Sequence, residues 1–397
     1  MAWEVAYVLP NLQIKKAIES EFISLVPFNH PRVRELRRDY SVLNRYLSRF
    51  SDAVGQRVKP SVILHRHPSP KSTRTPEAFG GFRDLLAMSV VPEARARGLT
   101  ERIRPSRVLY SNSFDPYPWI VTNDYENILL VSPAVLHFNE IDKFRGHTHP
   151  ELSTHDLQDR EIDEPLLARL IEEWSLRFTT KKPTRRSVAL FRSMNMASQA
   201  ARMPAATSGT LFDIGRLMIL WASAFEILIH PGYYDKLALS RIYDLLETIE
   251  WDTRFAKRRI YKVYGNPGKK RVAACWLYSL IHQLRNDFIH GNPVDRKKIV
   301  LPGTKGALWM HAAPLYRLML TAYLPLKFAR PLPPLSDPMA FAAVASERID
   351  FLRHQKLMEE AVRSAKPRSI SRGRKLRVYD RTPHQRVLRA GRVPAAH

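Results

Sequence analysis

The sequence predicts an α+β protein in which a mixed α/β region precedes an all-α helical bundle and a basic C-terminal tail. Before about residue 150, short strand-like apolar runs are mixed with helical ones. From about residue 160, apolar side chains recur at the helical period of 3.6 residues. The final segment is rich in arginine and thin in apolar side chains.

The composition of the 397 residues is that of a globular chain with a strongly basic charge. Hydrophobic residues make up 45%, and 63 Lys and Arg against 38 Asp and Glu give a net charge of +25. Such a balance favours polyanionic partners, meaning nucleic acid or an anionic membrane surface. The single cysteine, Cys275, fits a reducing cytoplasm. The most apolar run, residues 211–229, contains three charged residues, so we expect a soluble, cytoplasmic protein without a membrane partner.

Residues 1–180 are predicted to form the mixed α/β region. The runs VAYVL and SVILH predict strands, and WIVTNDYENILLVSPAVL predicts two strands around a polar turn. The basic run HPRVRELRRDYSVLNRYLSRF predicts a helix. Residues 67–76, HPSPKSTRTP, predict a loop because of their prolines and small polar side chains. These patterns leave the order of the strands open.

Residues 187–330 are predicted to form the helical bundle. A helix in EIDEPLLARLIEEWSLRF precedes it, and the basic linker KKPTRRS separates the two. The expected bundle helices span 187–203, 211–229, roughly 270–290 and 307–328, with a shorter helical pair at about 233–265. The stretch YGNPGKKR, residues 264–271, is interpreted as a basic turn before a helix. Residues 331–365 are predicted to be a proline-rich linker followed by an amphipathic helix from about 339.

Residues 366–397 are predicted to form a basic, disordered or fold-on-binding tail. Between residues 361 and 397 there are 11 Lys and Arg residues and one acidic residue, Asp380. Such an arm suits binding to nucleic-acid phosphate, while the alternative is a solvated tail that only aids solubility. The residues predicted to contact nucleic acid are Arg372, Arg374, Lys375 and Arg377 in the tail, and Lys181, Lys182, Arg185 and Arg186 in the basic linker.

The stretch LRNDFIHGN, residues 284–292, places an Arg, an Asn and a His at the end of a predicted helix. On a helical wheel, one apolar face holds Leu277, Leu280, Ile281, Leu284 and Phe288. The opposite face carries no Lys or Glu and holds Cys275, Ser279, His282, Asn286 and His290. Because a solvated face in so basic a chain usually carries such residues, this face predicts a second contact, either a partner subunit or a pocket.

Arg285, Asn286 and His290 are a set of side chains that suits phosphate chemistry. Arginine binds phosphate oxygens through a planar fork, histidine passes protons near neutral pH, and asparagine orients either one. Together they could activate an RNA 2′-hydroxyl and stabilise the developing charge without a metal. The alternative interpretation is a basic helix end that only complements the helix dipole.

The same residues resemble the signature of the HEPN superfamily, which is an Arg, a polar residue and then a His at a helix end. The Gly after the His, and the upstream helix LMILWASAFEILI with Glu226, resemble the Apea-like branch of that superfamily. The resemblance covers about residues 205–330. It implies a helical bundle that forms a homodimer through its motif helix, with a metal-independent ribonuclease site at the dimer seam.

By this resemblance, Arg285 binds the scissile phosphate, Asn286 orients it and His290 acts as acid and base. Glu226 is expected to pair with Arg285, and Glu226 and His282 are the candidate supporting residues. The implied function is that of an endoribonuclease in a defence or toxin-like response. The alternatives are a non-catalytic HEPN module that binds nucleic acid or regulates dimerisation, and an adaptor whose charge only keeps it soluble.

Other chemistries find little support in the sequence. His65 and His67, and likewise His147 and His149, have the spacing of metal ligands, because alternate strand residues share a face. Without a Cys cluster or an HExxH helix, we interpret both pairs as surface-loop histidines and predict no metal site. The chain contains no GxSxG, P-loop or GxGxxG motif, so we predict no cofactor and interpret Cys275 as a packed side chain.

Overall fold

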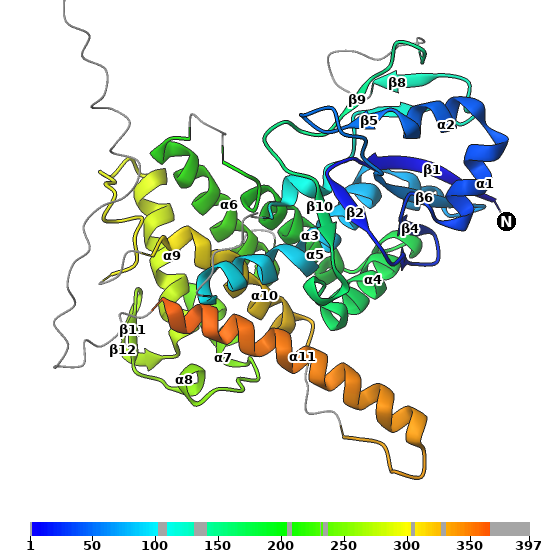
Figure 1. Ribbon diagram of the computed structural model, residues 1–397. Coiled ribbons are helices and arrows are strands. Elements are labelled where there is room, and N and C mark those ends of the chain that lie inside the picture. The colour runs from blue at the N-terminus through cyan, green and yellow to red at the C-terminus, as the bar shows by residue number, and fades with distance from the viewer. Residues whose placement is uncertain are drawn as a thin grey trace, which may run out of the picture. The chain divides into compact units, whose positions relative to one another are not determined.

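The computed structural model describes residues 2–101, 109–130, 141–204, 209–230, 232, 237–302, 306–326 and 331–365. Within these ranges the protein is α+β, with most strands in the first part of the chain and mainly helices after it (Figure 1). The predicted class is confirmed. The predicted basic tail, residues 366–397, lies outside the described residues. Across the described ranges, no helix combines the length and apolar composition that crossing a bilayer requires.

A four-stranded antiparallel sheet lies at the centre of the first region. Its order is β1 (Ala2–Leu9), β6 (Ser61–His67), β4 (Ile23–Val26) and β3 (Ile18–Glu19). β1 contains VAYVL and β6 contains SVILH, so both predicted strands are confirmed. Successive side chains point to opposite faces, which divides them between two cores: Leu9 and Ile63 join one, Val8 and Val62 the other.

Two short helices contribute to the core on the Val8 and Val62 face. They are α1 (Pro31–Asp39) and α2 (Ser41–Ser48), and they replace the single predicted helix because Tyr40 between them has an extended backbone. The described residues of this region also form three two-stranded pairs: β2 (Leu12–Ile14) with β10 (His155–Leu157), β5 (Phe50–Ser51) with β9 (Gly146–His147), and β7 (Trp119–Val121) with β8 (Ile128–Leu130). The last pair confirms the two strands predicted around a polar turn.

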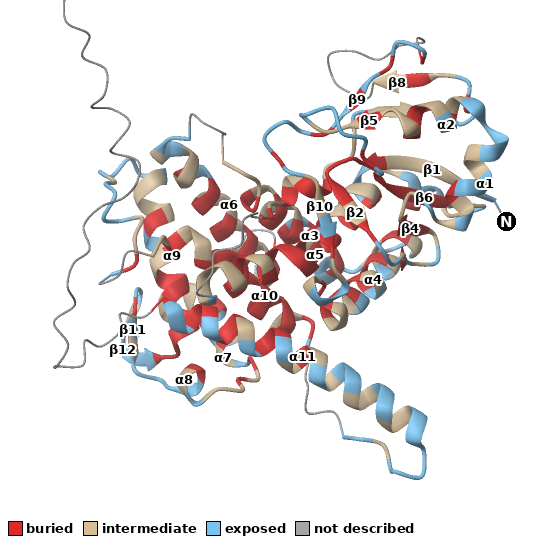
Figure 2. Ribbon diagram, viewed as in Figure 1, coloured by how far each residue is buried: buried red, intermediate tan, exposed pale blue. Residues whose placement is uncertain are grey.

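The long helix α3 (Pro76–Thr100) has no counterpart among the predicted elements. The Thr75 hydroxyl accepts the N–H of Ala78 at 3.2 Å, and Pro76 occupies the first turn. Most of the helix is buried (Figure 2), so it lacks the polar face by which a surface helix is recognised. A Cβ at Gly81 would meet the Phe191 ring at 3.0 Å, so this glycine lets α3 pack closely on α5 (Arg185–Ala200).

The helices after residue 160 follow the predicted helical stretches. They are α4 (Glu164–Thr179), α5, α6 (Leu211–Ile229), α9 (Ala273–Ile289), α10 (Ala312–Tyr323) and α11 (Pro338–Ser364). α6 begins and ends where the predicted helix at 211–229 does. α10 is shorter than the predicted 307–328, because a short 3₁₀ helix, Leu308–His311, precedes it. Residues 331–337 form neither helix nor strand, as expected for a linker.

The predicted helical pair at 233–265 is only partly helical. α7 (Leu239–Glu247) is a helix, but α8 (Arg254–Lys257) is a single turn. β11 (Tyr261–Val263) and β12 (Asn266–Arg271) then form an antiparallel hairpin. Gly265 at its turn has φ +73°, a conformation that hairpin turns use and helices do not. The stretch YGNPGKKR therefore supplies a turn and a strand.

A buried polar network joins α4, α10 and α11. Arg317 in α10 is 1% exposed, and its Nε donates to Asp163 Oδ2 at 2.7 Å. Its Nη1 donates to Gln355 Oε1 in α11 at 2.8 Å. Gln355 also donates to Glu359 at 3.1 Å, and Glu359 accepts backbone N–H groups from Asp252 and Thr253. Because these groups are hidden from water, their mutual bonds fix how the helices meet.

The main hydrophobic core is continuous across the predicted boundary at residues 180–187. It includes Leu9 of the sheet, Phe82 of α3, Leu284 of α9 and Met358 of α11. The described chain up to residue 365 belongs to one compact unit. The α/β region and the helices therefore share a core.

Candidate functional site

The motif residues lie at the C-terminal end of α9. The helix ends at Ile289, His290 is its cap residue, and Gly291 has φ +68°. A glycine in this left-handed conformation is a common way to end a helix, because it carries no Cβ. The side chain of His290 is exposed at this end, as its place in the last turn predicts.

α9 packs antiparallel against α6. Phe288 near the end of α9 lies over Gly215 near the start of α6, while Tyr278 lies 5.0 Å from Phe225, ring centre to ring centre. A Cβ at Gly215 would be only 2.5 Å from the Phe288 ring. The close approach of the two helices at the motif therefore depends on this glycine.

A polar cluster joins α6 and α9 beside the motif. Arg285 Nη2 donates to Glu226 Oε2 at 3.4 Å, and Arg285 Nη1 donates to Asn286 Oδ1 at 2.9 Å. Asn286 Nδ2 lies 3.4 Å from His282 Nδ1, and His282 Nε2 lies 4.0 Å from Glu226 Oε1. The structure thus brings together four of the residues singled out from the sequence, including the expected pairing of Glu226 with Arg285.

Burial shapes the electrostatics of this cluster. Burial raises the pKa of Glu226, against the opposing charges of Arg285 and His230. Burial and the nearby charge of Arg285 lower the pKa of His282. Both shifts favour the uncharged forms of these two side chains, beside the guanidinium of Arg285. Its Nε is buried without a hydrogen-bond partner. The cluster therefore presents a cation with an unsatisfied donor.

His290 stands apart from the polar cluster. Within the described part of the chain, no hydrogen bond or ion pair joins its side chain to Arg285, Asn286 or Glu226. Its backbone N–H donates to Asn286 at 2.9 Å, which holds the residue at the helix end. The three motif residues therefore share one helix end, with Arg285 and Asn286 in contact and His290 open to solvent.

The polar face of α9 is covered in its first half by the same chain. Cys275 and Ser279 are 0% and 1% exposed, and Cys275 Sγ donates to the backbone oxygen of Tyr243 in α7 at 3.5 Å. For these two residues the expected partner subunit or pocket is wrong, because α7 fills that place. Burial raises the pKa of Cys275 to about 12, in keeping with a packed, unreactive thiol.

The β11–β12 hairpin brings an aromatic side chain to the motif helix. The sequence interpretation missed this residue. Tyr264, at the hairpin turn, is 51% exposed, and its ring centre lies 5.9 Å from that of His282. Lys269 and Lys270 on β12 are also exposed. The signal was present in the sequence as a tyrosine before Gly-Asn-Pro-Gly and two lysines. Its meaning depends on the hairpin folding onto α9.

The predicted nucleic-acid contacts divide into two groups. Lys181, Lys182, Arg185 and Arg186 are exposed at the start of α5. Arg185 Nη2 donates to the His230 backbone oxygen at 3.0 Å, and Arg186 donates to that of Tyr323. These two arginines are thus held against their own chain. The tail residues Arg372, Arg374, Lys375 and Arg377 lie outside the described residues.

The two histidine pairs differ in the structure. His147 and His149 are exposed, as expected of surface histidines. His65 is fully buried on β6, so its interpretation as a surface-loop residue is wrong. It lies with His67 and Glu4 in a cluster whose ligand atoms are all within 4.8 Å of one another. Glu4 is far away in the sequence, and only the pairing of β1 with β6 brings it there.

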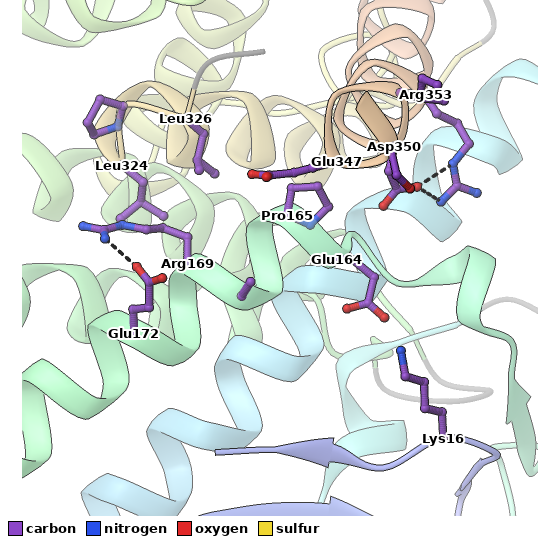
Figure 3. Close-up of a pocket in the computed structure, with 14 residues that line it drawn as sticks. Lys16, Glu164, Pro165, Arg169, Glu172, Leu324, Leu326, Glu347, Asp350 and Arg353 are labelled. Atoms are coloured by element: carbon purple, nitrogen blue, oxygen red, sulfur yellow. Dashed lines mark hydrogen bonds and ion pairs between the residues drawn. The ribbon is translucent and has the colours of Figure 1, made fainter. Parts of the chain in front are cut away.

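A cavity of about 1090 Å³ lies between α4, the end of α10 and α11 (Figure 3). Its wall carries the carboxylates Glu164, Glu172, Glu347 and Asp350 and the cations Lys16, Arg169 and Arg353. Arg169 pairs with Glu172 and Arg353 with Asp350, each at 2.7 Å. Two of its three cations are thus paired and its carboxylates outnumber its cations, so the cavity is poorly suited to phosphate, and none of the motif residues line it.

Comparison with known proteins adds no relative. No family model, curated protein or solved structure matches the chain. The candidate site therefore rests on its own residues: Arg285 and Asn286 in contact, Glu226 and His282 behind them, and His290 exposed at the helix end.

Proposed function

We propose that the protein is a HEPN-type, metal-independent endoribonuclease that acts as a homodimer in the cytoplasm. The observation that carries the proposal is that the Arg285–Asn286 pair, anchored to Glu226, and an exposed His290 occupy the same end of α9. The resemblance of these residues to the HEPN signature extends the proposal to a defence or toxin-like response.

The proposed chemistry is an internal transfer at an RNA phosphate. The 2′-oxygen attacks phosphorus and the bond to the 5′-oxygen breaks, which leaves a 2′,3′-cyclic phosphate and a free 5′-hydroxyl. Arg285 binds the phosphate oxygens and stabilises their growing charge. His290 accepts the 2′-hydroxyl proton, and a second copy of this imidazole donates a proton to the 5′-oxygen.

The surface around the motif supports RNA as the substrate. Tyr264 gives an exposed ring on which a base can stack, and Lys269 and Lys270 follow it on the same hairpin. Arg296 and Lys297, which follow the motif in the sequence, are exposed as well. Aromatic rings flanked by cations are a common way to hold single strands without reading their sequence.

Apolar exposure beside the motif supports the homodimer. Phe212 at the start of α6 is 79% exposed, and Ile289 at the end of α9 is 46% exposed. Antiparallel packing puts these two helix ends together, because Phe288 contacts Gly215. Burying both side chains against a second copy would remove apolar surface from water and bring a second His290 near the first.

A second function, a non-catalytic HEPN module that binds nucleic acid, is favoured by one observation. Arg285 is engaged by Glu226 and Asn286, and His290 is not joined to it within the described residues. Such a module would use the motif helix for dimerisation and its basic residues for binding.

The test is cleavage of mixed single-stranded RNA in EDTA. The native chain is expected to release fragments that end in a 2′,3′-cyclic phosphate, and Arg285→Ala/His290→Ala is expected to release none. The matched control is Arg145→Ala/His147→Ala, which removes another exposed Arg and His from the N-terminal region and should cleave like the native chain.

Two outcomes would reject the nuclease. One is cleavage that persists in the Arg285→Ala/His290→Ala variant, which would mark a contaminating enzyme. The other is salt-sensitive RNA binding without any cleavage by a dimeric chain, which would select the non-catalytic module. Sedimentation at the assay concentration reports the dimer separately.

A further inference from the structure

We infer that Glu4, His65 and His67 form a binding site for a zinc-class divalent cation on the N-terminal sheet. The three residues lie on one face of the β1–β6 pair, where Glu4 is directly opposite His65 and diagonal to His67. Their nearest ligand atoms all lie within 4.8 Å of one another. Two imidazole nitrogens and one carboxylate oxygen are ligands that Zn²⁺ and its neighbours prefer.

The hydrogen bonds of His65 leave one of its ring nitrogens available to a cation. Thr73 donates its single hydroxyl proton to the Pro70 backbone oxygen at 2.7 Å. It can therefore only accept from His65 Nε2, which lies 3.1 Å away. In the neutral imidazole, Nε2 then carries the proton and Nδ1 presents a lone pair.

That lone pair is buried and faces a carboxylate. His65 is 0% exposed, and its Nδ1 has no hydrogen-bond partner. It lies 3.7 Å from Glu4 Oε1. Two electron-rich atoms at this separation call for a cation between or beside them, either a metal ion or a proton. The Nε2–H bond to Thr73 is also the outer-shell contact that orients metal-bound histidines.

His67 supplies the second nitrogen from the more exposed side of the site. Its Nε2 lies 2.8 Å from Glu4 Oε1, and the two side chains are 34% and 28% exposed. A tetrahedral ion with bonds of about 2.0–2.1 Å sets its ligand atoms roughly 3.3 Å apart. The separations of His65 Nδ1 and His67 Nε2 from Glu4 Oε1, 3.7 Å and 2.8 Å, lie on either side of that spacing, and solvent would supply the remaining ligand.

Glu4 is suited to act as the anionic ligand. Its Oε1 lies 2.8 Å from His67 Nε2 and 3.7 Å from His65 Nδ1, so one carboxylate oxygen faces both imidazoles.

Arg74 is the group that opposes the ion. Its guanidinium contacts His67 Nδ1, and it also donates to Ser69 Oγ at 3.2 Å. Binding of a metal at His67 Nε2 leaves a proton on Nδ1, so Arg74 must withdraw. Its side chain is exposed and free to swing into solvent. Removing the Arg74 guanidinium should therefore strengthen metal binding.

The experiment is equilibrium dialysis of the chelator-treated full chain against micromolar Zn²⁺, with bound metal measured per chain. We expect one Zn²⁺, and the absorption bands of a four-coordinate site when Co²⁺ is used instead. Glu4→Gln and His67→Gln should each lower the affinity by about 100-fold or more, and Thr73→Val by about 10-fold as an outer-shell change. Arg74→Ala should raise it.

The matched control is His147→Gln/His149→Gln, which removes the other His-x-His pair and should keep the native affinity. Circular dichroism identifies any variant that fails to fold, and the Arg74→Ala arm needs no loss of structure to be informative. Absence of Zn²⁺ and Co²⁺ binding in both the native chain and Arg74→Ala would overturn the inference and assign the cation to a proton. Binding lost only in the His147→Gln/His149→Gln control would overturn it as well.

Discussion

Arg317 and Arg285 both pair with a carboxylate between helices, yet their surroundings differ. The Arg317 side chain is 1% exposed and lies 2.7 Å from Asp163, which is 3% exposed. The Arg285 side chain is 25% exposed and lies 3.4 Å from Glu226, which is 22% exposed. The first pair has a short N–O distance and is sealed from solvent. The second has a longer N–O distance and is reachable by solvent.

The difference separates an arginine that holds the fold from one that is available for binding. Removing one partner of a sealed pair leaves the other charge buried, which costs far more than the pair itself contributes. A reachable pair is screened by water and contributes little to stability. The second arginine can therefore change partners without loss of the fold, as a phosphate-binding residue must.

The largest expected effect is on Arg317. Arg317→Leu should lower the free energy of unfolding by about 3–5 kcal/mol, because it leaves the Asp163 carboxylate buried without its cation. Arg285→Leu should lower it by less than about 1 kcal/mol. Urea denaturation of both variants measures the contrast. Equal losses would mean that Arg285 is also a structural residue.

A second buried side chain, His311, predicts a pH dependence of stability. Burial lowers the pKa of His311 to about 4, although its bond to the Ala361 oxygen opposes the shift. Between about pH 4 and 6.5 the folded state thus binds fewer protons than the unfolded state. The contribution of His311 to the free energy of unfolding is therefore complete above about pH 6.5. It is lost as the pH falls toward 4, and amounts to about 3 kcal/mol. The stability difference between the native chain and His311→Gln should change over that window, and a flat difference would contradict the shift.

Packing at the motif end is tested by Gly215. Gly215→Ala should cost about 1–3 kcal/mol, because the new methyl group would overlap the Phe288 ring. The matched control is Gly98→Ala in α3, where a Cβ would meet nothing within 4 Å. There the substitution should be neutral or stabilise by up to about 1 kcal/mol. Thermal melting of the two variants gives the comparison, and similar melting temperatures would show that Phe288 moves aside easily.

The smallest effect on stability is expected for His290. His290→Ala should change the free energy of unfolding by less than about 0.5 kcal/mol, because its side chain is exposed and removed from the polar cluster. The same substitution should abolish RNA cleavage. A large drop in melting temperature would show that the imidazole is structural and would remove it from the proposed mechanism.

The sequence predicted helices that have one apolar face and missed those that do not. α6 and α9 were found because their apolar positions recur at the helical period. α3 was missed because it is buried on most sides and contains Gly80, Gly81 and Pro92, which weaken a helical pattern. The β11–β12 hairpin was missed because its short strands are polar.

The candidate sites likewise divide into contacts that could be predicted from the sequence and contacts that could not. The pairing of Glu226 with Arg285 could be expected, since both lie at helix positions that were correctly assigned. The cover that α7 places over Cys275, and the approach of Glu4 to His65, depend on contacts between segments far apart in the chain. Local patterns carry no information on such contacts.

Helix α11 has a consequence for the order of events during synthesis. Its His354 contacts Glu93 of α3 across 261 residues, and both side chains are buried. At the usual speed of translation the ribosome needs roughly 10–50 s to make the intervening chain. Over that interval Glu93 can pair with Arg97 in its own helix but lacks His354, and the surface of α3 that faces α11 is uncovered. The motif helix α9 leaves the ribosome before α11 does, so the core that α9 shares with Met358 of α11 is complete only when α11 has been made.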